Sequence, residues 1–215
     1  TETAGKPLEV VFGEPEKAIE NKEYTSSIVV TPNKSNSTIT APTVNGLTVT
    51  SEVNSEGNTV GKVTGTPKIT DWDGIEDNRD VTIKVTVSHE GDTPVTKDIV
   101  VNVLRDTDGD GNPDNTDPDD DNDGIPDEQD KNPKVADDLT GTVTPPAPVR
   151  EKAAITPVTV VTSNKPDSKN TQENPEPVNG LSVNVKGELT GTPKVDDWGK
   201  DEEERQIKIP VKVTK

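Results

Sequence analysis

The sequence predicts an all-β protein in which two small sandwich modules flank a segment of loops. Val81, Ile83, Val85 and Val87 alternate with polar residues, which is the pattern of a half-buried strand. Sixteen glycines and 19 prolines separate such runs with turn sequences. Apolar residues make up 26% of the chain and aromatic residues 2%, so we expect thin cores rather than one large core.

The chain contains two copies of one module. From residue 64 onward the two copies are related by a constant offset of 126, and before it the second copy is eight residues shorter. The matching segments are 44–47 with 178–181, 64–68 with 190–194, 71–72 with 197–198, 81–87 with 207–213 and, upstream, 16–18 with 151–153. A repeated module predicts a repeated fold.

Each copy is expected to contain hairpins. In the first copy, residues 47–50 pair with 59–63, and residues 81–87 pair with 95–104 across the turn Glu90-Gly91-Asp92. In the second copy, residues 181–185 pair with 188–189. Short strands with turns at this spacing are typical of a β-sandwich.

The motifs Gly-Leu-x-Val, Thr-Gly-Thr-Pro and Val-x-Ile-x-Val resemble those of Ig-like and cadherin-like modules in bacterial surface proteins. The resemblance implies an all-β fold of two Ig/cadherin-like β-sandwich modules, at residues 6–105 and 149–215. Between them we place a tandem Asp-rich segment at 106–133 and a Pro-rich linker at 134–148. The second copy stops at Lys215 without a counterpart of strand 95–104, so that strand is either cut off or supplied by other means.

Trp72 and Trp198 are the two tryptophans and occupy equivalent positions in the repeat. We expect each to close one end of its sandwich, because aromatic-poor modules need their few large side chains for the core. The alternative is a stacking platform for a sugar.

The middle segment has a regular spacing of acidic residues. Residues 106–130 hold 11 Asp, one Glu and no basic residue. The pattern D-x-D-x-D-G-x-x-D-x-x-D begins at Asp106 and again at Asp119. A solvated acidic run needs no such spacing, whereas Ca²⁺ does, because it takes six to eight oxygen ligands arranged around a tight turn.

Each loop therefore predicts a calcium site, with carboxylates at positions 1, 3, 5, 9 and 12 and a backbone carbonyl at position 7. The predicted ligands are Asp106, Asp108, Asp110, Asn112, Asp114, Asp117, Asp119, Asp121, Asp123, Ile125, Asp127 and Asp130. We expect two or more Ca²⁺ ions, and Asp120 is an extra carboxylate that could bridge a third. A magnesium or manganese site and a disordered acidic linker are the alternatives.

Proline at position 8 of both loops, Pro113 and Pro126, and the lack of flanking amphipathic helices distinguish these loops from EF-hands. The tandem loops instead resemble thrombospondin type 3 calcium repeats, which implies the same aspartates as ligands. The segment has almost no apolar residues, so we hypothesise that Ca²⁺ orders it and makes the joint between the modules rigid.

Composition also narrows the classes of function. The net charge of −18 argues against nucleic acid as a partner, and no apolar run is long enough for membrane insertion. The chain has no Cys and a single His, His89, which excludes thiol chemistry and His-based triads. We expect no enzyme activity.

A β module, a calcium segment and a second β module, all strongly acidic, resemble the biofilm-associated adhesins of Gram-positive cell surfaces. The resemblance implies an extracellular, cell wall-anchored protein whose signal and anchor lie outside these residues. It implies intercellular adhesion and biofilm formation through self-association with copies on neighbouring cells. We expect β-rich, amyloid-like self-association at low pH, opposed by calcium. The alternatives are a passive stalk and a carbohydrate-binding accessory region of a secreted enzyme.

Overall fold

The computed structural model describes residues 5–215. The chain forms two compact units, and the boundary between them in the sequence falls between Asn122 and Asp123. Apart from one short 3-10 turn, η1 (Asp127–Gln129), every regular element among the described residues is a β-strand. The predicted all-β class is therefore confirmed. Across residues 5–215, no helix has the length and apolar character that a membrane crossing requires.

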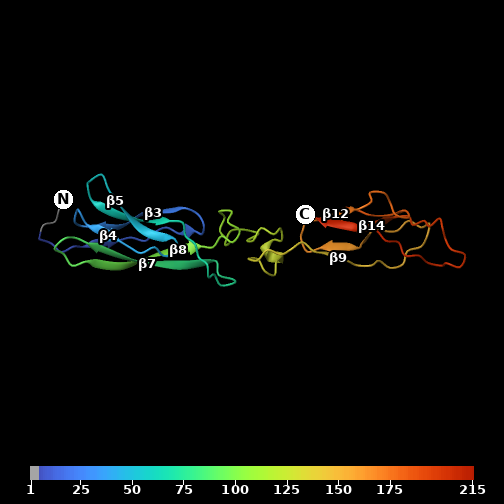
Figure 1. Ribbon diagram of the computed structural model, residues 1–215, viewed down its shortest axis with the longest axis horizontal. Coiled ribbons are helices and arrows are strands. Elements are labelled where there is room, and N and C mark those ends of the chain that lie inside the picture. The colour runs from blue at the N-terminus through green and yellow to red at the C-terminus, as the bar shows by residue number, and fades with distance from the viewer. Residues whose placement is uncertain (1–4) are drawn as a thin grey trace. The chain divides into compact units, whose positions relative to one another are not determined.

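The first unit is a sandwich of two four-stranded sheets, which form separate layers in Figure 1. One sheet has the order β1-β3-β6-β5 and the other the order β2-β8-β7-β4. If β2 is left out and the other seven strands are lettered A to G along the chain, the two sheets have the ABED and CFG arrangement of an Ig-like sandwich. β2 is a short extra strand that pairs in parallel with β8, the last strand. The strands are β1 (Val10–Phe12), β2 (Ala18–Ile19), β3 (Tyr24–Pro32), β4 (Thr38–Thr40), β5 (Leu47–Val53), β6 (Thr59–Gly65), β7 (Asn78–Ser88) and β8 (Val95–Leu104).

The core of the first unit lies between these sheets. Alternate residues of β7 point inward, and the four predicted from the sequence pattern are at most 2% exposed. They pack against inward residues of both sheets in one continuous cluster. Both predicted hairpins are confirmed, since β5 pairs with β6 and β7 pairs with β8, in each case antiparallel.

The repeated Asn-Gly-Leu and Thr-Gly-Thr-Pro motifs meet at one tight crossing. Asn45 and Gly46 both have positive φ, as a two-residue hairpin turn requires, and the Asn45 side chain donates to the carbonyl of Lys68. Gly65 has φ +131, and a Cβ built there would lie 2.0 Å from the carbonyl oxygen of Gly46. The motif therefore repeats because only glycine fits where the two chain segments cross.

The second unit repeats part of this fold with shorter strands. Its sheets have the orders β10-β14-β13, β11-β9 and β12-β15. Its small core contains Val160, Val161, Leu181, Val183 and Leu189. The strands are β9 (Gly141–Val143), β10 (Val158–Thr159), β11 (Val161–Ser163), β12 (Lys169–Gln172), β13 (Leu181–Val183), β14 (Glu188–Gly191) and β15 (Val211–Thr214). The predicted pairing of residues 181–185 with 188–189 is confirmed by the antiparallel pair β13 and β14.

Hydrogen bonds correct the upstream alignment of the two copies. The carboxylate of Glu20 accepts from Ile69 N and Trp72 Nε1, and that of Glu151 accepts from Val195 N and Trp198 Nε1. Glu151 is thus the counterpart of Glu20, and the predicted match of residues 16–18 with 151–153 is wrong. The upstream offset is 131, which short identical tripeptides could not reveal.

Candidate metal centre

The first Asp-rich loop begins directly after β8 and is anchored to the first unit. Asp106 is 2% exposed, and its N–H donates to the Glu20 carboxylate over 3.2 Å. Its two carboxylate oxygens accept from the N–H groups of Gly109 and Gly111 at 3.0 and 2.9 Å. Both glycines have positive φ, which lets the loop curl around the Asp106 side chain.

The loop brings the carboxylates at positions 1, 3 and 5 together. One oxygen from each of Asp106, Asp108 and Asp110 lies within 4.8 Å of the others. Two oxygens bound to one Ca²⁺ are at most about 5 Å apart, because each bond is about 2.3–2.6 Å long. The three oxygens therefore fit around a single cation of this size. The donors are all carboxylate oxygens, which suit a hard cation such as Ca²⁺.

The electrostatics at this loop also favour a cation. Partial burial raises the pKa of Asp108 above its usual value, and the neighbouring charges of Asp110 and Asp106 raise it further. A divalent ion among these groups would offset the repulsion that makes the ionised form costly.

The remaining predicted ligands of the first loop are placed differently. Asn112 donates its backbone N–H to Asp110 over 2.7 Å. The Asp114 carboxylate accepts from Thr107 N and Oγ1 at 2.7 and 2.6 Å, and its side chain is 1% exposed. An oxygen of Asp114 lies within 4.8 Å of oxygens from Asp77 and Asp120.

Asp114 therefore belongs to a second acidic group, which joins the loop to the segment just before β7. Asp120, the extra carboxylate of the sequence pattern, is in this group and is 5% exposed. Asp77 was not predicted. It lies 29 residues upstream of Asp106, outside any repeated spacing, so only the fold reveals its proximity.

The boundary between the two compact units falls inside the second predicted loop. Asp117, Asp119 and Asp121 belong to the first unit, and the Asp119 N–H donates to Asp117 Oδ1 over 3.0 Å. Asp123, Ile125, Asp127 and Asp130 belong to the second unit.

In the second unit, oxygens of Asp123, Asp130 and Asp137 lie within 4.8 Å of one another. Asp123 accepts from Ile125 N at 2.7 Å and from Asp137 N at 2.8 Å. Oδ2 of Asp130 is buried and has no hydrogen-bond partner among the described residues. Asp127 begins η1, and the Ile125 side chain is 5% exposed. Asp137 lies beyond the repeated pattern, so no spacing signal in the sequence points to it.

The tryptophans bear on the sugar-stacking alternative. Trp72 packs against the core, and the guanidinium groups of Arg79 and Arg105 each lie 5.4 Å from its ring centre. This confirms the packing interpretation for Trp72. Trp198 has one such neighbour, Arg205 at 5.6 Å, and is 36% exposed.

No protein-family model matches the sequence, and no curated protein matches it. Several solved structures of cadherin domains are similar in part. They include protocadherin gamma B7 extracellular cadherin domains 1–4, with TM-score 0.35, 9% identity and coverage of 88% of this chain and 44% of that one. PcdhgB3 EC1-4 is similar with TM-score 0.39 and 10% identity, over 88% of this chain and 43% of that one. Mouse cadherin-23 EC22-24 is similar with TM-score 0.35 and 12% identity, over 87% of this chain and 55% of that one. The chain spans about half the length of these structures. Likeness at this level carries no information about function.

Proposed function

We propose that the chain is a calcium-binding structural region of an extracellular adhesive protein, in which Ca²⁺ orders the Asp-rich segment 106–130. The observation that carries the proposal is the convergence of Asp106, Asp108 and Asp110 within 4.8 Å. These residues occupy positions 1, 3 and 5 of a repeated loop pattern, so the sequence spacing and the loop geometry select the same carboxylates.

Calcium would supply the attraction that the segment otherwise lacks. Residues 106–130 carry 11 Asp and one Glu, and Ile125 is their one buried apolar side chain in the described structure. An apolar core cannot offset this much like-charge repulsion, whereas a divalent ion bound only to the folded form stabilises it by mass action. Asp106, Asp108 and Asp110 would hold an ion in the first loop, and Asp123 and Asp130 would contribute ligands in the second.

Contacts of the first loop would transmit this ordering to the first module. The backbone N–H of Asp106 donates to the Glu20 carboxylate, which also accepts from the indole N–H of Trp72. The Asp114 N–H donates to the carbonyl of Arg105 over 2.8 Å. A metal that holds the Asp106 carboxylate therefore also stabilises the end of β8. We propose that the result is a compact, rigid segment between the two modules.

The matched test compares the doubly substituted Asp106→Asn/Asp108→Asn protein with Asp98→Asn, an exposed aspartate on β8. If the dissociation constant of the site in the first loop is about 10⁻⁴–10⁻³ M, 10 mM Ca²⁺ bound there raises the free energy of unfolding of the first module by about 1.4–2.7 kcal/mol. We expect wild type and Asp98→Asn to show this increase in urea denaturation and the double variant to lose most of it. The amides of Gly109 and Gly111 should exchange faster after chelation. The proposal would be contradicted if Ca²⁺ changed neither the free energy of unfolding nor the amide exchange of any of the three proteins.

The adhesive part of the proposal rests on the modular architecture and on the resemblance to Gram-positive biofilm adhesins. In this role the protein is a non-enzymatic surface component. It associates with copies on neighbouring cells, and calcium limits that association. The same architecture could serve as a passive stalk, which would not self-associate.

A further inference from the structure

The strand β5 forms a long edge of the first module. The two sheets of this module end at β1, β5, β2 and β4, of which β5 has seven residues and the others two or three. Proteins usually protect sheet edges with short strands, prolines, bulges or charges. β5 contains no proline and pairs with β6 without a bulge, and its one charged residue, Glu52, forms an ion pair with Lys62 at 3.0 Å. The β5 edge therefore lacks the usual protection.

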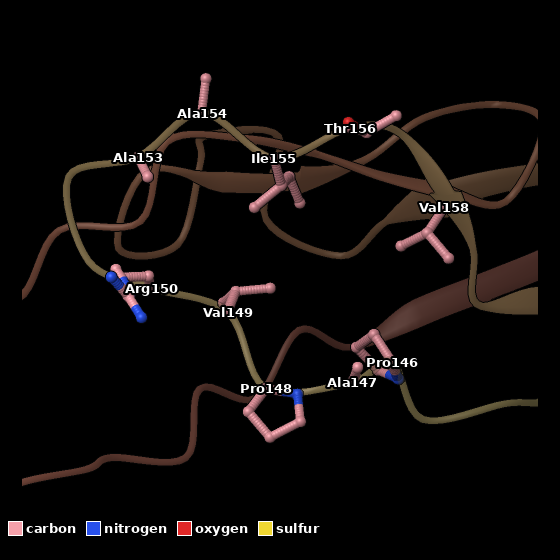
Figure 2. A pocket seen from close by; sticks show the side chains of 10 residues that line it. All are labelled: Pro146, Ala147, Pro148, Val149, Arg150, Ala153, Ala154, Ile155, Thr156 and Val158. Atoms are coloured by element: carbon pink, nitrogen blue, oxygen red, sulfur yellow. The ribbon is translucent and has the colours of Figure 1, made fainter.

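The length of β5 comes from an insertion that the second module does not have. Asn54 and Asn184 mark equivalent hairpin turns, because Oδ1 of each accepts from the backbone N–H groups two and four residues later. With these turns aligned, the eight additional residues of the first copy are 50–53 and 59–62. The counterpart of β5 is β13, which has three residues. The other edge strand of that sheet, β10, has two, and Figure 2 shows Val158 at its start.

The backbone of β5 presents hydrogen-bonding groups on its open side. The N–H of Asn54, just after the strand, donates to the opposite arm of the hairpin over 2.9 Å. Backbone groups alternate in direction along a strand, so Val49, Ser51 and Val53 direct theirs away from β6. Leu47 agrees with this, because its N–H and carbonyl bond to the preceding turn. Within residues 5–215, no other segment bonds to the backbone of residues 49, 51 and 53 on that side.

The apolar side chains of β5 fit a second copy of the same strand. If two copies run antiparallel with Ser51 opposite Ser51, Val53 of each copy lies opposite Val49 of the other. Val53 is 69% exposed, whereas Val49 is 7% exposed and belongs to the core. This register therefore covers an exposed valine with a valine at the edge of the core.

The charges on the outer face of the hairpin match in the same register. Thr50 pairs with Lys62 of β6 on one side, and Glu52 of the second copy lies opposite Thr50 on the other side. The side chain of Thr50 is short, so the long side chain of Lys62 can reach across it. Each Lys62 then stands between Glu52 of its own chain and Glu52 of the second copy, which is favourable in a chain of net charge −18.

We propose that the β5 edge, residues 49–53, is the surface through which two copies of the chain associate. The two β5 strands pair antiparallel about Ser51 and join the β1-β3-β6-β5 sheets of both copies into one sheet. This inference rests on the self-association in the proposed function and names its surface, and it does not depend on calcium. The interface is small, so each contact is weak and many copies on facing surfaces act together.

Amide hydrogen exchange of the whole chain, measured by NMR at micromolar and at millimolar concentration, tests the surface. We expect the N–H groups of Val49, Ser51 and Val53 to exchange several-fold more slowly at the higher concentration, because only the pair gives them acceptors. The amides of β1, at the opposite edge of the same sheet, should not change. Equal protection at both concentrations would assign the edge to a partner within the same chain and overturn the proposal.

Two matched substitutions test the side chains. Val53→Lys places a charge at the pairing edge, whereas Val11→Lys places the same charge at a 71% exposed position of β1. Both change the net charge equally, so they differ only in position. We expect sedimentation velocity to show that Val53→Lys raises the dissociation constant of the dimer at least about tenfold and that Val11→Lys leaves it nearly unchanged. Equal effects would count against the β5 edge.

Disulfide trapping tests the register. The chain has no Cys, so Ser51→Cys introduces a single thiol. Residues directly opposite in an antiparallel pair have Cα atoms about 5.5 Å apart or closer, which suits a disulfide. We expect this variant to form a covalent dimer under mild oxidation much faster than Val11→Cys, and equal rates would overturn the register.

The outcomes separate this surface from the proposed function. A chain that associates without protection at residues 49–53 overturns the surface alone. A chain that stays monomeric at millimolar concentration overturns the surface together with the proposed self-association. Calcium binding is tested separately by the variants of Asp106 and Asp108.

Discussion

At the scale of single residues, the equivalent glutamates Glu20 and Glu151 accept different sets of hydrogen bonds. Glu20 is 6% exposed and uses both carboxylate oxygens, one for Asp106 N and the other for Ile69 N and Trp72 Nε1. Glu151 is half-buried and uses Oε2 alone, for Val195 N and Trp198 Nε1. The additional bond to Asp106 connects the Asp-rich loop to the core of its module.

This difference predicts unequal effects of the same substitution. Glu20→Gln replaces one accepting oxygen by an amide that faces an N–H, which should cost the first module about 1–3 kcal/mol. Glu151→Gln can retain its bonds through the remaining oxygen and should cost less than about 1 kcal/mol. Hydrogen exchange resolves the stability of each module separately. A larger loss in the second module than in the first would contradict this explanation.

At the scale of elements, the crossing of Gly46 and Gly65 sets the geometry of the β5–β6 hairpin. Gly65→Ala would place a Cβ 2.0 Å from the Gly46 carbonyl at φ +131, and should destabilise the first module by about 3 kcal/mol or more. Gly57→Ala is the matched control. Gly57 also has positive φ, but no atom lies within 4 Å, so we expect a loss of about 1–2 kcal/mol. Thermal unfolding followed by circular dichroism compares the two, and equal losses would count against the crossing.

Some strands and acidic groups could be predicted from the sequence, and others depend on contacts that only the fold creates. The hairpins of the first module follow from alternation and turn residues, which are local signals. The short strands β1 and β2 have too few residues for a pattern, and they form because β3 and β8 supply their partners. The convergence of Asp106, Asp108 and Asp110 follows from loop spacing, whereas Asp77 and Asp137 join their groups through the fold.

At the scale of the whole molecule, charge governs association. The net charge is −18 and the pI about 4.4, so repulsion between copies is lost near pH 4.5. Sheet edges that no strand covers are then less protected against pairing with another copy. We expect light scattering at this pH to rise with protein concentration, and more so after chelation than with millimolar Ca²⁺. Equal scattering in both conditions would contradict the role of calcium, and none in either would favour a passive stalk.

Calorimetric titration of the chain with Ca²⁺ tests the central claim most directly. We predict at least two bound ions per chain, with dissociation constants of about 10⁻⁴–10⁻³ M. The Asp106→Asn/Asp108→Asn protein should bind one ion fewer than Asp98→Asn. An absence of binding at millimolar Ca²⁺, or the same stoichiometry in both variants, would contradict the account.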